Sequence, residues 1–228
     1  MGITRSTIEY ERDILQYLNL DYKGLKWCEL GNQLMINDDN VVTGSAKDVY
    51  LSLGVDHISI DINGEDGSLP IDLDLPLPFI LLDQFDVITD YGTIEHVDNQ
   101  YQVFKNTHDM CRKGGMMIHI LPLVGTYPGH CQYYYSEEFM VGLARACGYS
   151  VISYEIIDET DIKIPKKLVA TTYLKTKGKS FISENEFSTL PGIIDTGDTT
   201  HTGNYTKKSE NIIRRIIRKF YHEYWNHR

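Results

Sequence analysis

The sequence predicts an α/β protein whose core is a seven-stranded, mostly parallel sheet with helices on both faces. Three observations lead to this fold class. Short buried segments, typical of parallel strands, alternate with longer amphipathic segments up to about residue 175. Several of the short segments end at a glycine or an acidic residue, where a strand can turn into a loop. The length of 228 residues, with 42% hydrophobic and 24% charged residues, suits one globular domain.

The first part of the chain predicts a helix followed by a strand–helix–strand unit. Ser6 and Glu9 form a capping-box pattern, which favours a helix beginning there. The segment Leu-Lys-Trp-Cys-Glu-Leu then runs into Gly31, a residue that permits a sharp turn at the end of a strand. Strands are predicted at residues 25–30 and 57–61, with a helix at 45–53 between them.

The alternation continues through the middle of the chain. A helix that begins at Ser136 is expected to stop at Gly148, because glycine is favoured just after a helix ends. The last two predicted strands allow antiparallel pairing at one edge of the sheet. Further strands are predicted at residues 69–73, 85–89, 116–121, 150–157 and 167–175, and further helices at 98–111 and 136–147.

The C-terminal part differs in composition from the domain predicted at 1–177. Residues 178–206 are rich in Ser, Thr, Gly, Asn and Asp, which is typical of a linker or surface loop. Residues 207–228 are basic and carry apolar side chains in pairs four residues apart, which predicts an amphipathic helix. We expect this helix to dock on the domain or on a second copy in a homodimer; peripheral contact with a membrane surface is the alternative.

Charge is distributed very unevenly along the chain. The formal net charge is −10, and no Lys or Arg lies between Lys47 and Lys105, a stretch that contains twelve Asp and Glu residues. The predicted C-terminal helix has seven basic residues and two acidic ones, a balance of +5. An acidic domain repels a phosphate backbone, so we expect no nucleic-acid partner.

The four cysteines and the absence of a hydrophobic leader indicate the cellular setting. Their spacing contains no Cys-x-x-Cys pair and no zinc-ligand pattern, which favours reduced, packed thiols. No apolar run approaches the length of a membrane span, and the N-terminus lacks the apolar region of a signal peptide. These features predict a cytoplasmic protein.

Polar residues follow four of the predicted strands at their carboxyl ends. In an open α/β sheet, ligands bind outside these ends at the point where the chain crosses over. A carboxylate there, such as Asp61, can accept hydrogen bonds from both hydroxyls of a ribose. The residues at these ends are Glu29, Gly31, Asn32, Asp61, Ile62, Asp72, Leu73, Asp90 and Tyr91.

Over residues 25 to about 175 the sequence resembles the class I S-adenosylmethionine-dependent methyltransferases. The segment 27–31, Trp-Cys-Glu-Leu-Gly, is similar to their first motif, although this family has two or three glycines there. Asp61 corresponds to the ribose-binding acid, and residues 93–97, Thr-Ile-Glu-His-Val, resemble an extension of the fourth motif. The resemblance implies a Rossmann-like methyltransferase fold, S-adenosylmethionine as cofactor with S-adenosylhomocysteine as product, and cofactor binding by the strand-end residues named above.

A dinucleotide-dependent dehydrogenase is the rival nucleotide-binding fold. It needs a Gly-x-Gly-x-x-Gly loop after the first strand so that the pyrophosphate can approach the backbone, and this pattern is absent. The acidic region also disfavours a pyrophosphate and favours a cosubstrate with a cationic sulfonium.

Methyl transfer to a hydroxyl requires a base close to the ends of the central strands. His96, His119 and Asp90 are the candidates, with His130 a weaker one; His119 is equally explained as a buried core imidazole. Four tyrosines in the loop after the fifth predicted strand suggest walls for a sugar or a phenol, unless they only pack the loop. The expected reaction is O-methylation of a glycan or other small-molecule hydroxyl; N-methylation of a small amine and a non-catalytic scaffold are the alternatives.

Metal dependence is the weaker alternative for this chemistry. Glu95, His96 and His130 resemble the Glu-x-x-Glu-His pattern and later His that hold a divalent ion in some enzymes of this class. The first Glu of that pattern corresponds here to Gly92. We therefore expect a metal-independent site, with these three residues as weak metal candidates.

Overall fold

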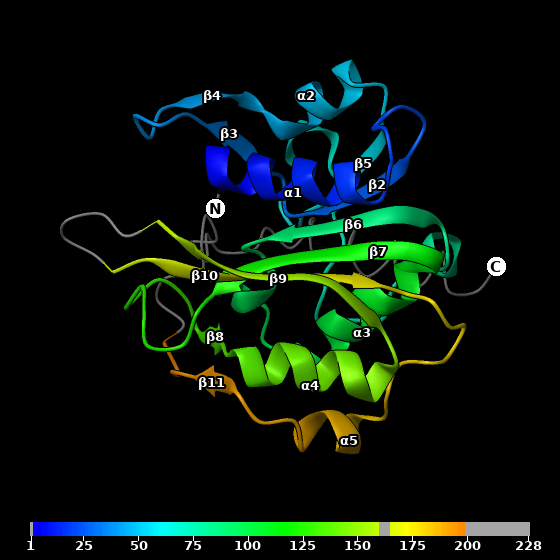
Figure 1. The fold of residues 1–228 in the computed structure, drawn as a ribbon, viewed down its shortest axis with the longest axis vertical. Coiled ribbons are helices and arrows are strands. Elements are labelled where there is room, and N and C mark those ends of the chain that lie inside the picture. Colours follow the sequence, from blue (N-terminus) through cyan, green and yellow to red (C-terminus); the bar gives the residue numbers. More distant parts are fainter. Residues whose placement is uncertain (1, 160–164, 199–228) are drawn as a thin grey trace, which may run out of the picture.

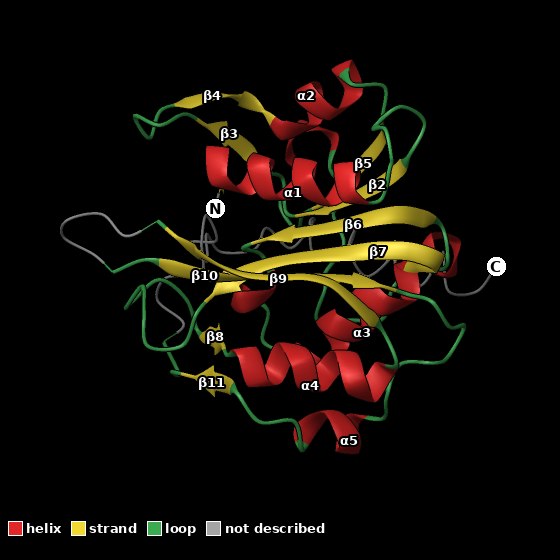
Figure 2. Ribbon diagram, viewed as in Figure 1, coloured by secondary structure: helices red, strands yellow, loops and turns green. Residues whose placement is uncertain are grey.

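A six-stranded mixed sheet crosses the centre of the protein in a computed structural model that describes residues 2–159 and 165–198 (Figures 1 and 2). Four neighbouring strands pair in parallel, and β10 runs antiparallel to both of its neighbours. This arrangement confirms the mostly parallel sheet and the antiparallel edge. In sheet order, the strands are β5 (Asp56–Ile60), β2 (Lys26–Leu30), β6 (Phe85–Tyr91), β7 (Cys111–Pro122), β10 (Lys167–Leu174) and β9 (Ser150–Asp158).

Helices cover both faces of the sheet, as predicted. Helices α1 (Arg5–Tyr17) and α2 (Ala46–Ser52) lie on one face, and α3 (Gln100–Met110), α4 (Glu137–Cys147) and α5 (Glu184–Ser188) lie on the other (Figure 1). Gly148 ends α4 with a φ of 72°, in the left-handed region that glycine adopts without strain. Three short 3₁₀ helices are η1 (Glu65–Gly67), η2 (Phe79–Leu81) and η3 (Ile94–His96).

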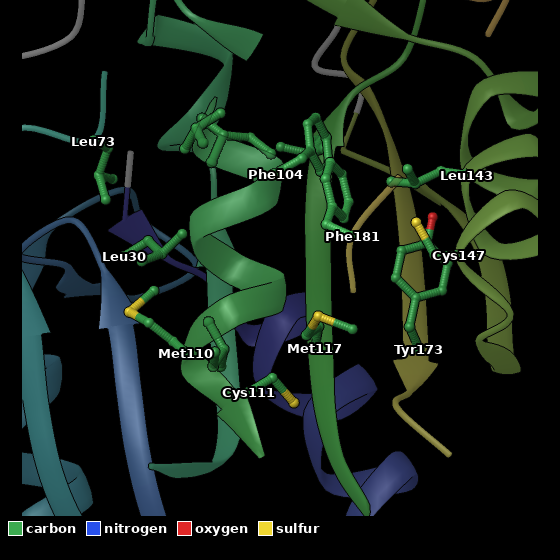
Figure 3. Close-up of a cluster of buried hydrophobic side chains, with 14 of the residues drawn as sticks. Leu30, Leu73, Phe104, Met110, Cys111, Met117, Leu143, Cys147, Tyr173 and Phe181 are labelled. Carbon is green, nitrogen blue, oxygen red and sulfur yellow. The ribbon is translucent and has the colours of Figure 1, made fainter. Parts of the chain in front are cut away.

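The alternation of side chains along β7 divides the interior into two cores. Met116 and Ile118 pack in the core under α1 and α2, whereas Met117 and Leu121 pack in the core under α3 and α4. His119 has the same parity as the second pair, so its side chain belongs to the α3 and α4 side. Figure 3 shows this second core, with Phe104 of α3, Met117 of β7, Tyr173 of β10 and Cys147 of α4 around a common centre.

The strand predicted at residues 69–73 is absent from the described sheet, which therefore has six strands instead of seven. A single parallel bridge joins Leu69 to Ile60, and the backbone of Leu69 exchanges two hydrogen bonds with that strand. Pro70 follows at once, and a proline has no N–H with which to continue a ladder. The segment continues as a loop that ends the sheet beside β5.

The N-terminal capping box was also predicted wrongly. Thr4 is the N-cap of α1, and its hydroxyl accepts the N–H of Thr7. The hydroxyls of Thr4 and Ser6 instead donate to the carboxylate of Glu159, which also pairs with Lys166. The Ser6 hydroxyl is therefore engaged by a residue far along the chain, which local sequence patterns do not reveal.

A small three-stranded sheet, none of whose strands was predicted, joins the N-terminus to the segment after β2. Its strands are β1 (Gly2–Ile3), β3 (Leu34–Ile36) and β4 (Val42–Ser45), in the order β1-β3-β4. The hairpin turns at Asn40, which has a φ of 58°, a conformation that asparagine tolerates better than most residues.

The segment after β10 packs on the domain as far as the structure describes it. Phe181, Ile182 and Phe187 are buried in the core of α3 and α4. Strand β11 (Ile193–Asp195) pairs antiparallel with β8 (Tyr133–Tyr135). Residues 178–198 are thus part of the folded domain, whereas the predicted helix at 207–228 lies outside the described residues.

Two further observations concern the cysteines and the described helices. All four cysteines are free and buried, which confirms the prediction of packed thiols. Among the described helices, none has both the length and the apolar character needed to cross a membrane.

Candidate functional site

The direction in which successive strands are added to the sheet reverses at β2. The chain leaves β2, enters β5 on one side of it, and later returns as β6 on the other side. Leu30 pairs with Ile60 and with Asp90, so the residues that follow the three strands lie at one edge. In α/β sheets this switch point is where ligands bind.

Asp61 joins the ends of β2 and β5. One carboxylate oxygen accepts the N–H of Asn32 at 2.9 Å, and the other accepts the N–H of Asn63 at 2.9 Å. The side chain is 8% exposed, and Ile62 follows it at the same edge. Two backbone donors therefore hold the Asp61 carboxylate in a fixed position at the switch point.

Gly31 is required by the geometry of the loop after β2. Its φ is 81°, and a Cβ there would lie 2.5 Å from Thr93 Oγ1 and 2.7 Å from Gln33 Nε2. Both of these groups donate to the carbonyl of Leu30, at 2.8 and 3.2 Å respectively. The family that the sequence resembles has further glycines in this loop. Here the side chains of Thr93 and Gln33 close it instead.

Glu29 supports the same loop from inside. Its Oε1 accepts the N–H of Gln33 at 2.9 Å, and its Oε2 lies 3.5 Å from His57 Nε2. Burial raises the pKa of this carboxyl, an effect that contacts with His57 and Gln33 oppose. Asn32 Oδ1 and Gln33 Oε1 are buried acceptors that lack a hydrogen-bond partner among residues 2–159 and 165–198.

The segment with Asp72 and Leu73 is held against the start of α3. Asp72 Oδ1 accepts the N–H of Asp74, and Asp74 in turn accepts the N–H of Asn99 at 2.7 Å. Leu73 is buried, and its carbonyl accepts a hydrogen bond from Asn106. This segment lies beside β5 because Leu69 bridges to Ile60.

Asp90 and His119 form a buried pair. Asp90 Oδ2 lies 3.0 Å from His119 Nδ1, and Asp90 Oδ1 accepts the N–H groups of Thr93 and Ile94. The ring of His119 contacts those of Phe104 and Tyr173, and the residue is 1% exposed. This placement agrees with the alternative interpretation of His119 as a buried core imidazole, and its contact orients Asp90.

The side chain of Tyr91 points away from this group. Its hydroxyl donates to Glu11 Oε2 at 2.6 Å, in the core under α1. Tyr50 donates to the same oxygen, and Tyr22 donates to Glu11 Oε1. Of the predicted cofactor residues, Tyr91 thus contributes only its backbone to the carboxyl edge.

Glu95, His96 and His130 converge beside the end of β6. Glu95 and His96 lie on η3, and His130 lies in the loop between β7 and β8. Glu95 Oε1 is 3.8 Å from His96 Nε2 and 3.7 Å from His130 Nε2. The ring of Tyr127 stacks on that of His130, with centroids 4.0 Å apart.

The Glu95 carboxylate is completely buried. Neither of its oxygens has a hydrogen-bond partner within the described part of the chain. Burial raises the pKa of Glu95 to about 7, against the opposing effect of His96, and burial lowers the pKa of His96. This carboxylate is an acceptor held in a dry position next to two imidazoles.

Sequence reasoning missed the residues that brace this group. Gln100 Nε2 donates to the carbonyls of Ile94 and Val97, and Gln100 Oε1 accepts the hydroxyl of Tyr135. A glutamine in the first turn of a helix carries no distinctive signal. Thr93 lies in the quoted segment 93–97 and Gln33 lies just after the first motif, but their contacts depend on how two distant loops meet.

Comparison of the fold shows similarity to solved methyltransferase structures. One is the 1,6-didemethyltoxoflavin-N1-methyltransferase of Burkholderia thailandensis, with 1,6-didemethyltoxoflavin and S-adenosylhomocysteine bound; the TM-score is 0.53 at 12% identity, covering 74% of this chain and 77% of that one. Another is a putative sarcosine dimethylglycine methyltransferase from Galdieria sulphuraria, with a TM-score of 0.51 at 12% identity, covering 75% and 86%. No family model and no curated protein sequence matches the chain. The chain therefore has the Rossmann-like methyltransferase fold.

Proposed function

We propose that this protein is an S-adenosylmethionine-dependent methyltransferase. The observation that carries the proposal is the meeting of the Gly31 loop and Asp61 at the switch point of a methyltransferase fold, where Asn32 N–H donates to the Asp61 carboxylate. This is the edge at which α/β proteins bind nucleotides. The acidic surroundings favour a cationic cosubstrate over a pyrophosphate.

The described residues fit this cofactor. A carboxylate oxygen accepts up to two hydrogen bonds, so Asp61 can hold ribose hydroxyls while its backbone contacts keep it in place. The buried acceptors Asn32 Oδ1 and Gln33 Oε1 suit the ammonium group of the methionine part. When bound, the cofactor supplies an electrophilic methyl group on sulfur. The remaining cofactor contacts fall to Glu29, Gly31, Ile62, Asp72, Leu73, Asp90 and the backbone of Tyr91.

We place the acceptor next to η3. His96 and Glu95 lie just after the end of β6, so His96 is the base candidate nearest to that end of the sheet. His119 is a positioning residue in this account, because it touches Asp90 inside the core. An alcohol needs proton removal before it can attack, so this arrangement suits O-methylation of a sugar or other small-molecule hydroxyl.

N-methylation of a small amine is the second candidate. The buried Glu95 carboxylate has no hydrogen-bond partner among the described residues, and a cationic amine would neutralise it. The names of the two solved structures described above give nitrogen-containing small molecules as substrates. This supports a small-molecule acceptor, whether it carries a hydroxyl or an amine.

Mass spectrometry of a panel of sugars, phenols and amines tests the function. With S-adenosylmethionine present, we expect one acceptor class to gain the mass of a methyl group in place of a hydrogen. The exchange His96→Gln should abolish this gain, whereas Glu138→Gln, on the exposed first turn of α4, should leave it unchanged. Cofactor binding without transfer to any acceptor would instead favour the non-catalytic scaffold.

A further inference from the structure

We propose that Glu95, His96 and His130 form a site for a divalent transition-metal ion. Each residue offers one ligand atom, and all three atoms lie within 4.8 Å of one another. The metal site does not depend on the proposed function; with an ion bound, His96 would be a ligand, and the ion instead of the imidazole would lower the pKa of an acceptor hydroxyl. It would add a binding site that the fold similarity does not imply.

The spacing of the atoms supports coordination over hydrogen bonding. The separations of 3.8 and 3.7 Å from Glu95 Oε1 to His96 Nε2 and His130 Nε2 exceed the range of a hydrogen bond. Ligands about 2.1 Å from a tetrahedral ion stand about 3.4 Å apart, and small side-chain movements would close the difference. The three groups thus surround a common point without hydrogen bonds between them.

Burial supplies an independent argument. A carboxylate that is fully buried normally pairs with hydrogen-bond donors, because loss of hydration destabilises its charge. Neither oxygen of Glu95 has such a partner in the described ranges, and burial raises its pKa. A divalent cation at this point would compensate the charge that the protein leaves uncompensated.

The surrounding structure holds these ligands in position. Gln100 Nε2 donates to the carbonyls of Ile94, the first residue of η3, and of Val97, just after it, and Asp90 accepts the N–H groups at the beginning of η3. On the opposite side, Tyr127 stacks on the His130 ring at an interplanar angle of 13°. Metal sites depend on this kind of support, because it fixes the orientation of ligands before the ion binds.

The donor set indicates the class of ion. One carboxylate oxygen with two imidazole nitrogens suits Mn²⁺, Fe²⁺, Co²⁺, Ni²⁺ or Zn²⁺ better than Mg²⁺ or Ca²⁺, which prefer oxygen ligands. Three protein ligands leave coordination positions open, as in catalytic metal sites. An acceptor hydroxyl could take one of these positions, where the ion would acidify it.

Titration of the chelator-treated, full-length protein with Mn²⁺ tests the site. Isothermal titration calorimetry and the loss of the free-ion electron paramagnetic resonance signal should both give one ion per chain, without any cofactor present. Glu95→Gln, His96→Gln and His130→Gln should each weaken binding by more than about tenfold. Glu138→Gln removes an exposed carboxylate of α4 and should bind as the wild type does.

Thermal unfolding separates loss of the site from loss of the fold. Glu95→Gln replaces an unpartnered buried carboxylate with a neutral group of the same shape, so the metal-free variant should unfold at or above the wild-type temperature. Mn²⁺ should raise the unfolding temperature of the wild type and leave that of this variant unchanged. No saturable binding, or equal binding in all three variants, would overturn the proposal. Titration with S-adenosylmethionine is scored separately, so failure of the metal site and failure of the proposed function give different results.

Discussion

The backbone N–H of Asn32 donates to the carboxylate of Asp61 across 2.9 Å, joining the ends of two neighbouring parallel strands. Asn32 follows β2 and Asp61 follows β5, so this bond sets the distance between the loop and the acid that we propose as the ribose ligand. The loop on one side of the bond and the carboxylate on the other are therefore best treated as one unit.

The loop geometry predicts that Gly31→Ala destabilises the protein. Alanine would be strained at a φ of 81°, and its Cβ would collide with Thr93 Oγ1. We expect the free energy of unfolding, measured by urea denaturation, to fall by about 1–3 kcal/mol. Gly44→Ala is the matched control, because nothing lies within 4 Å of its Cβ position. Equal stability of the two variants would show that the loop relaxes freely.

The cluster around Glu11 predicts a cost for Tyr91→Phe. This exchange removes one of the three tyrosine hydroxyls that donate to a buried carboxylate. A hydrogen bond to a buried charge contributes about 1.5–3 kcal/mol, and we expect a loss of that size in urea denaturation. Tyr17→Phe, at a position 75% exposed, should change little. An unaltered Tyr91→Phe variant would contradict the role assigned to this hydroxyl.

The Asp90–His119 pair predicts a structural effect of His119→Leu. The exchange leaves one oxygen of the buried Asp90 carboxylate without its partner. We expect the free energy of unfolding to fall by about 2–4 kcal/mol. A variant that keeps full stability but loses all methyl transfer would instead show that His119 acts on the acceptor directly.

His108 predicts a pH dependence of stability. Burial lowers the pKa of His108 to about 4, and the charges of Lys175 and Lys105 act in the same direction. Asp109 and the Lys179 carbonyl act in the opposite direction. The neutral ring accepts from Tyr149 and donates to the Lys179 carbonyl. An imidazole in the unfolded chain titrates near pH 6.5, so between these values the unfolded state binds more protons. The stabilisation is complete above about pH 6.5 and is lost as the pH falls towards 4.

Urea denaturation at pH 7.5 and pH 4.5 of wild type and His108→Gln checks this dependence. Glutamine can replace both hydrogen bonds but does not titrate. We expect the wild type to lose up to about 3 kcal/mol more than the variant on acidification. An equal loss in both proteins would show that other groups account for the acid sensitivity.

Local patterns predicted β2 and β5 well, because each is a short buried segment closed by Gly31 or Asp61. Strand β6 was also predicted, but it continues to Tyr91, beyond its expected end at residue 89. The helix caps were less predictable, since Glu159 binds the hydroxyl of Ser6 from far along the chain. The missing strand shows that Pro70 limits the ladder after a single bridge at Leu69. Hydrophobicity alone did not reveal this limit.

The candidate site was predictable only where residues follow strands directly. The parity of β7 already places His119 with Met117 and Leu121, on the side of the core under α3 and α4. In contrast, His130 meets Glu95 because a loop folds back beside η3, and no spacing in the sequence encodes that return. Long-range convergence of this kind depends on tertiary structure.

Binding of S-adenosylmethionine tests the central claim most directly. Isothermal titration calorimetry of the full-length protein should give saturable binding of one molecule per chain and no binding of NAD. Asp61→Ala should weaken the affinity by more than about tenfold, which corresponds to at least about 1.4 kcal/mol. Asp56→Ala, at the opposite end of the same strand, should bind as the wild type does. Binding of NAD without S-adenosylmethionine, or equal affinity of the two variants, would contradict the account.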